Sequence, residues 1–190
     1  MDITLQEWEN EYGINFLKKV GIKKNFVVLD FGARVGHYSL PAAKLVNPKG
    51  KIFALDKNHE ALDELKDKAK TNTLSNMKII KTDGEIKLDF PNSFFDTILL
   101  YDVLHYFDIE QLRKLFSEMY RLLKPQALLS LYPKHIEKED YTLPQIIEVL
   151  KKHNFTKKEK VCDHISHYNS INYDCVYNFY AERIKTGKDN

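Results

Sequence analysis

Short apolar runs alternate with longer segments of helical periodicity along most of this 190-residue chain. The first run, 26–31 (FVVLDF), is continuous and stops at a glycine, which is typical of a strand buried on both faces of a parallel sheet. Four further strands are predicted at 51–55, 77–80, 94–101 and 128–132. The segments between them predict helices at 37–47, at 59–73 and from a capping box at Asp108 and Gln111 to Pro125. A second capping box, Thr142 with Gln145, predicts a helix after the fifth strand.

The end of the chain departs from this alternation, because segments 155–163 and 173–183 follow each other without a helix and indicate an antiparallel pair. The predicted fold is therefore α/β: a Rossmann-like, doubly wound, seven-stranded sheet, mostly parallel, with a C-terminal antiparallel β-hairpin. A helix over 4–20 opens the chain. We divide the sequence into a helical segment that covers the site, one Rossmann-like domain and a disordered tail, at 1–25, 26–184 and 185–190.

Charge and cysteine content narrow the classes of function. The formal net charge of +2 creates no field that would draw the protein to nucleic acid or to an anionic membrane. The acidic N-terminus does not resemble a signal peptide, and no apolar stretch approaches the ~20 residues of a membrane span. Cys162 and Cys175 are too few for a disulfide framework, so we expect a cytoplasmic protein.

The loop after the first strand carries the strongest site signal. It places Asp30 at the strand end, followed by Gly32 and Gly36 before a helix begins. Glycines allow close approach of a ligand to the backbone, and the helix start offers free N–H donors. The spacing Asp-x-Gly-x-x-x-Gly differs from the Gly-x-Gly-x-x-Gly that holds a dinucleotide pyrophosphate. A carboxylate there would repel phosphate but suits a ligand with an ammonium group, which favours S-adenosylmethionine over NAD.

Acidic residues also follow the next two predicted strands. Asp56 ends the second strand, where a carboxylate can accept hydrogen bonds from both hydroxyls of a ribose. Asp83 follows the third strand and is placed to receive an adenine amino group. Each acid also has a purely structural interpretation, since Asp56 can begin the next helix and Asp83-Gly84 is a common turn pair.

Three segments resemble class I S-adenosylmethionine-dependent methyltransferases, in the small-molecule branch of that family: 28–56, 95–105 and 118–132. The resemblance covers roughly residues 26–160 and keeps the motif order. It implies that positions matching Asp30, Gly32, Gly36, Asp56 and Asp83 bind S-adenosylmethionine, and that residues 101–103 flank its methionine part. We therefore expect a cofactor site formed by Asp30, Gly32, Ala33, Arg34, Gly36, Asp56, Lys57, Asp83, Gly84 and Tyr101.

Arg34 is the main departure from the family pattern, because the family commonly has a glycine there, in Gly-x-Gly-x-Gly. A positive φ at this position would cost an arginine roughly 1 kcal/mol, which a folded protein tolerates. Two interpretations stay open. Arg34 aims its guanidinium at the cofactor carboxylate, or the pocket is degraded and the protein only binds a protein partner.

His105 is the candidate general base, since it follows the fourth strand near the expected acceptor and has a near-neutral intrinsic pKa. Alternatively, the His105 side chain only packs at the edge of the sheet. Methyl transfer from a sulfonium is an in-line displacement that needs chiefly alignment and exclusion of water, so a base is optional. Tyr38 and Tyr101 are candidates for a ring beside the sulfonium, or for ordinary packing.

The acceptor is predicted to be a small molecule, contacted by the N-terminal helix, the 101–107 and 133–142 loops and the final hairpin. No Asn-Pro-Pro-Tyr motif follows the fourth strand, so methylation of a nucleic-acid base is disfavoured. Cys162, His164 and His167 are metal-ligating residue types without a metal-binding spacing, so no metal site is predicted. The sequence indicates no oligomeric state. A nicotinamide-dependent oxidoreductase is a weaker alternative, because it requires the other glycine spacing.

Overall fold

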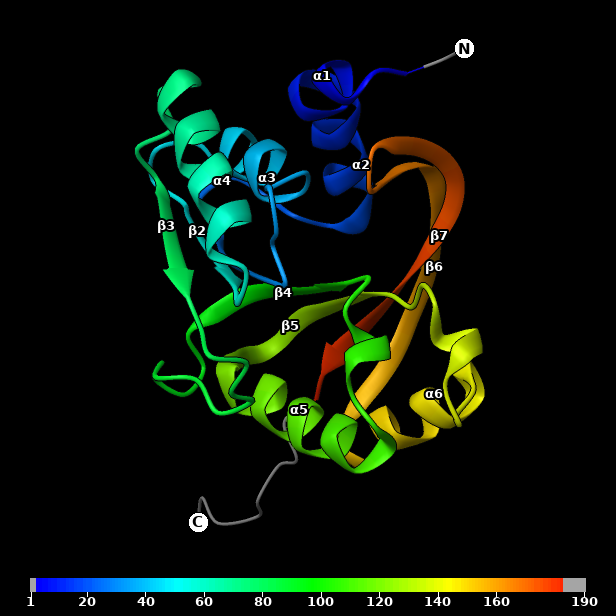
Figure 1. The fold of residues 1–190 in the computed structure, drawn as a ribbon. Coiled ribbons are helices and arrows are strands. Elements are labelled where there is room, and N and C mark those ends of the chain that lie inside the picture. The colour runs from blue at the N-terminus through cyan, green and yellow to red at the C-terminus, as the bar shows by residue number, and fades with distance from the viewer. Residues whose placement is uncertain (1–2, 183–190) are drawn as a thin grey trace.

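Seven strands form one mixed sheet in the computed structural model, which describes residues 3–182 (Figure 1). The strand order is β3-β2-β1-β4-β5-β7-β6, parallel from β3 to β5 and antiparallel from β5 onward. This confirms the predicted fold class. The strand bounds are β1 Val27–Phe31, β2 Lys51–Asp56, β3 Met77–Lys81, β4 Phe95–Tyr101, β5 Leu123–Tyr132, β6 Phe155–His167 and β7 Ser170–Ala181.

Helices cover both faces of the sheet (Figure 1). On one face lie α2 (Gly13–Val20), α3 (Ser39–Val46) and α4 (His59–Thr71), and on the other α5 (Ile109–Leu122) and α6 (Leu143–Lys152). Capping boxes begin α5 and α6, at Asp108 with Gln111 and at Thr142 with Gln145, as predicted. The short elements are α1 Leu5–Glu7, the π-helical turn η1 Trp8–Tyr12, and the 3₁₀ turns η2 Leu104–Tyr106 and η3 Ile136–Lys138.

Strand β1 separates two apolar clusters. Val28 packs with α2 and α3, whereas Leu29 and Phe31 pack with α5 and α6. This placement explains the uninterrupted apolar run of β1, because a strand covered by helices on both sides has no face for polar residues.

Trp8 anchors the N-terminal helices to the rest of the fold. It is fully buried, it packs against Phe16 and Tyr38 with ring centroids 5.6 and 5.7 Å away, and its indole N–H donates to the His37 carbonyl at 2.8 Å. Residues 5–20 therefore cover the sheet as the predicted opening helix does, with a π-helical turn in the middle. The predicted tail, 185–190, lies outside the described residues.

The C-terminal hairpin extends past the sheet. Strand β5 pairs with β7 only from Leu128 to Leu131, whereas β6 and β7 pair with each other as far as His167 and Ser170. The hairpin thus curves up beyond the edge of β5 (Figure 1). Its turn, Tyr168-Asn169, reaches the carboxyl ends of the parallel strands.

The two cysteines, for which the sequence suggested no disulfide framework, are bonded to each other across this hairpin. Cys162 and Cys175 lie directly opposite in the β6–β7 register and form a disulfide. The sequence analysis considered only the number of cysteines, and not the strand register that brings these two together. Among residues 3–182, no helix combines the length and apolar character that crossing a membrane requires.

We expect Trp8→Ala to lower the free energy of unfolding by about 3–5 kcal/mol, because it removes a large buried ring and leaves the His37 carbonyl without its donor. Urea unfolding followed by circular dichroism measures this, since the variant lacks the only tryptophan. Tyr173→Ala, at a side chain 69% exposed, is the control and should change stability by less than about 1 kcal/mol. Equal effects of the two substitutions would contradict the anchoring role of Trp8.

Candidate functional site

Two adjoining hollows open at the carboxyl ends of the parallel strands. The larger hollow has a volume of about 510 Å³ and is lined from β2, β4 and the segments after β1, β3 and β4. The smaller hollow has a volume of about 340 Å³ and extends beneath the hairpin turn. Both volumes suit small organic ligands. The wall that they share is formed by Gly32, Arg34, Tyr101, Asp102 and Tyr168.

Asp30 is a buried carboxyl group at the smaller hollow, near the end of β1. Its Oδ2 accepts a hydrogen bond from the Ser39 hydroxyl at 2.5 Å. Burial raises the pKa of Asp30 to about 6; the Ser39 hydrogen bond opposes this shift and the negative charge of Asp56 adds to it. A cationic group in the smaller hollow would favour the ionised form of Asp30.

Steric contacts and backbone conformation favour glycine at two positions of the loop after β1. Gly32 has φ of +85°, and a Cβ there would lie 3.1 Å from Val103 Cγ2. Gly36 has φ of +87°, and a Cβ there would overlap the Leu65 side chain. These two positions let the loop pass between β4 and α4. Ala33 lies between them, buried, and its N–H donates to the Leu55 carbonyl.

Arg34 adopts the backbone conformation that the family's glycine would favour. Its φ is +45°, and its N–H donates to Asp56 Oδ2 at 2.8 Å. Its guanidinium lies 4.9 Å from the centre of the Tyr168 ring, a cation–π distance. The side chain therefore contacts the hairpin turn, and the loop retains its bond to β2.

Asp56 joins the ends of β1 and β2. It is 8% exposed, and its second carboxylate oxygen accepts from the Asn58 N–H at 2.8 Å. Asp56 and Lys57 line the larger hollow, with the Lys57 ammonium 5.1 Å from the Tyr106 ring. On the far side of this hollow the lining residues are Thr82 and Gly84; Asp83 between them is exposed and does not line it.

Tyr101 is buried and Tyr38 is half-buried, and both line the smaller hollow. Their rings meet edge to face at 4.6 Å. The Tyr38 hydroxyl donates to the Ser166 carbonyl, and the Tyr101 hydroxyl shares a hydrogen bond with Ser130. Burial raises the pKa of both hydroxyls above the usual range, so they stay neutral. The Tyr38 bond holds the hairpin, and the Tyr101 bond joins β4 to β5.

His105 lies in η2 and lines neither hollow. Its Nδ1 is 3.5 Å from Asp102 Oδ1. Asp102, in contrast, lines both hollows and also contacts two other histidines. His135 Nδ1 lies 2.8 Å from its Oδ1, and His167 Nε2 lies 3.1 Å from its Oδ2.

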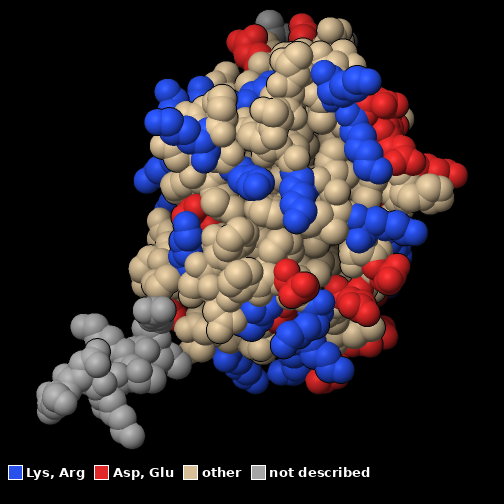
Figure 2. Space-filling view, turned by 90° about the vertical axis from the view of Figure 1, so that its left-hand side faces the viewer, with Lys and Arg blue, Asp and Glu red and all other residues tan. Residues whose placement is uncertain are grey.

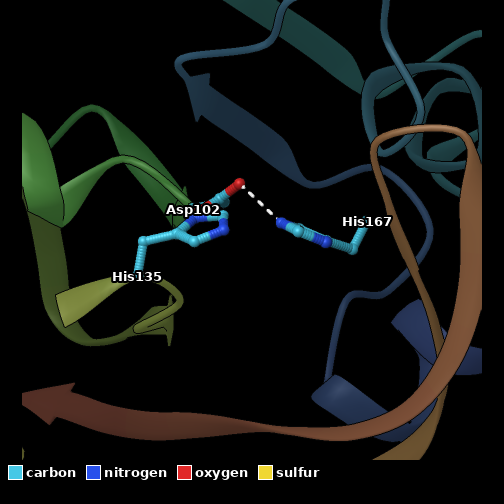
Figure 3. A group of neighbouring side chains, drawn as sticks. All are labelled: Asp102, His135 and His167. Atoms are coloured by element: carbon cyan, nitrogen blue, oxygen red, sulfur yellow. Dashed lines mark hydrogen bonds and ion pairs between the residues drawn. The ribbon is translucent and has the colours of Figure 1, made fainter. Parts of the chain in front are cut away.

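Sequence reasoning thus missed the Asp102–His135–His167 cluster (Figure 3). The only available signal was the expectation that the 101–107 loop, the 133–142 loop and the hairpin meet at the acceptor. Each of these three segments supplies one residue of the cluster.

Comparison with known proteins identifies the family. The model of a methyltransferase domain family matches residues 28–126, more than half of the chain. The chain belongs to this family. A crystal structure of an S-adenosylmethionine-dependent methyltransferase from Aquifex aeolicus is 25% identical, covers 88% of this chain and 87% of its own, and has a TM-score of 0.69. The resemblance seen in the sequence is confirmed, and family membership implies S-adenosylmethionine as the cofactor.

Curated relatives share only part of their length with this chain. A demethylmenaquinone methyltransferase from Lactobacillus johnsonii is 28% identical over 63% of this chain and 48% of its own. A probable ribosomal RNA small subunit methyltransferase A from Methanosphaera stadtmanae is 35% identical over 44% of this chain and 28% of its own. The chain spans about half the length, or less, of these relatives, which differ in the acceptor that their names give.

Stability should depend on pH through Asp30. Because the pKa is raised from 3.8 to about 6 in the folded protein, the protonated form stabilises the fold, and this contribution is lost as pH rises through 6. We expect Asp30→Asn, which carries no charge, to match the wild type near pH 4 and to exceed its stability by up to about 3 kcal/mol above pH 7.

Urea unfolding of the unliganded protein between pH 4 and 7.5 measures this difference. Asp67→Asn, an exposed substitution on α4, is the matched control and should leave the pH profile unchanged. Parallel profiles for wild type and Asp30→Asn would contradict the proposed titration.

Proposed function

We propose that this protein is an S-adenosylmethionine-dependent methyltransferase that transfers a methyl group to a small-molecule acceptor by in-line displacement. The observation that carries the proposal is the pair of hollows joined along Gly32 and Asp102 at the carboxyl ends of β1 and β4. This is where a Rossmann-like fold binds ligands, and two joined compartments suit a cofactor and an acceptor.

The larger hollow is proposed to hold the adenosine part of the cofactor. Asp56 would accept the two ribose hydroxyls, since its oxygens have free lone pairs beside their backbone N–H donors. Lys57 and Gly84 line the same hollow. The contact of Asp83 with the adenine amino group stays a prediction, and it requires the exposed carboxylate to turn inward.

The methionine part would cross Gly32 and Ala33 towards Asp30, whose carboxylate would pair with the ammonium group. Tyr101 lines this passage, and the reactive methyl group would then lie beside the wall that both hollows share. An acceptor in the smaller hollow would approach that methyl from the hairpin side. Displacement at a sulfonium needs alignment of the two reactants and exclusion of water. The two walls would align the reactants, and the hairpin turn would exclude water.

The general base assigned to His105 also stays a prediction. Its side chain lines neither hollow and contacts Asp102, so we expect it to act through Asp102. Arg34, the residue that raised the alternative of an inactive partner-binding protein, keeps the loop's bond to Asp56. That arrangement favours retention of cofactor binding.

The formal net charge of +2 favours a small-molecule acceptor over nucleic acid. Figure 2 shows the side on which β3 lies, where lysine and arginine side chains are interspersed with acidic and neutral ones. RNA binding usually needs a clustered basic surface. Binding of RNA that weakens steeply with salt would contradict this part of the proposal.

A cytoplasmic location stays a prediction. Disulfides are rare in a reducing cytoplasm, so the bond between Cys162 and Cys175 weighs against it.

Isothermal titration with S-adenosylmethionine and S-adenosylhomocysteine tests the proposal. We expect both to bind to the wild type, and Asp56→Ala to weaken binding by about tenfold or more, because the ribose hydroxyls lose their acceptor. Asp63→Ala, an exposed acid on α4, is the matched control and should bind as the wild type does. A folded wild-type protein that binds neither ligand would favour the inactive, partner-binding alternative.

A further inference from the structure

Asp102, His135 and His167 bring three metal-ligating atoms into one cluster, with all of them within 4.8 Å of one another. The residues come from different parts of the fold. Asp102 follows β4, His135 precedes η3, and His167 ends β6. In Figure 3, His167 reaches towards Asp102 from the hairpin, while His135 comes from the segment after β5.

We propose that these three residues form a binding site for a divalent transition metal ion of the zinc, cobalt or iron class. Two imidazoles and one carboxylate are a ligand set that such ions favour, and three protein ligands leave coordination positions open. The carboxylate lies 2.8 Å from one imidazole nitrogen and 3.1 Å from the other, close to the spacing of neighbouring ligands around an ion with bonds of about 2.0–2.2 Å.

His105 supports this assignment. Its Nδ1 is buried, has no hydrogen-bond partner among the described residues, and lies 3.5 Å from Asp102 Oδ1. A buried nitrogen without a partner is uncommon and calls for an explanation. With an ion bound, His105 would donate to the Asp102 oxygen that faces it, which is how ligating carboxylates are commonly oriented. His105 is then a positioning residue.

The site lies at the wall of the smaller hollow, because Asp102 and His167 both line it. The following step rests on the proposed function. The acceptor is a hydroxylated molecule, and its oxygen takes an open coordination position on the ion. Coordination lowers the pKa of a hydroxyl.

The hydroxyl proton passes to solvent, and the oxygen forms a bond to the methyl carbon. The electrons of the breaking carbon–sulfur bond return to sulfur, giving the methyl ether, S-adenosylhomocysteine and one proton.

Titration of the full chain with Co²⁺, followed by visible absorption and calorimetry without thiol reductants, tests the metal site. We expect one Co²⁺ per chain, with ligand-field bands, and displacement by Zn²⁺. His135→Ala and His167→Ala should each weaken binding by about 100-fold or more, and His105→Ala by about tenfold. His164→Ala is the matched control, since it removes an exposed histidine from the same strand, and it should bind Co²⁺ as the wild type does.

Titration of the same variants with S-adenosylhomocysteine separates this inference from the proposed function. Loss of Co²⁺ binding in His135→Ala with unchanged S-adenosylhomocysteine affinity supports a metal site distinct from the cofactor site. Failure of the wild type to bind Co²⁺, or equal binding by wild type and His167→Ala, overturns the metal site even if the cofactor binds. Failure to bind S-adenosylhomocysteine with Co²⁺ binding intact overturns the proposed function and leaves the metal site standing.

Discussion

Parallel strands can be joined only by connections that cross a face of the sheet, and in this protein most of those crossovers contain a helix. The strands from β3 to β5 therefore all end at one edge, and the loops that follow them meet there. Helices on both faces bury the strand interiors, so polar side chains concentrate at this edge. Asp30, Asp56 and Asp102 are near neighbours for this reason, although 72 residues separate the first from the last.

The antiparallel hairpin completes the site in a way that the parallel strands cannot. Because β7 enters the sheet between β5 and β6, the turn between β6 and β7 points back towards the carboxyl ends of the parallel strands. The hairpin is longer than its pairing with β5, and the excess length carries His167 and Tyr168 over the smaller hollow. Hydrogen bonds from Tyr38 to the Ser166 carbonyl and from Lys19 to Asp163 hold it there.

Much of the fold was predictable from sequence patterns that span only a few residues. The apolar run before Gly32 predicted β1, and the pair Asp108 and Gln111 predicted the start of α5. Of the acids predicted at three strand ends, Asp30 lines the smaller hollow, Asp56 lines the larger one, and Asp83 lines neither. Contacts between distant residues were not predictable in this way. Asp102 lies 33 residues from His135 and 65 from His167, and their meeting depends on strand order, hairpin length and register. The disulfide depends on the same register.

Different elements of the fold form the two walls of the site. The wall proposed to hold the cofactor comes from the loop after β1 and the end of β2, where Gly32 and Gly36 are required sterically and Asp56 accepts two backbone N–H groups. A side chain added at either glycine would meet Val103 or Leu65. The opposite wall comes from the hairpin turn, where Tyr168 and Asn169 are exposed and His167 is half-buried. If the proposed function holds, the acceptor wall can therefore vary more freely than the cofactor wall, and Asp102, which lines both hollows, lies where the two walls meet.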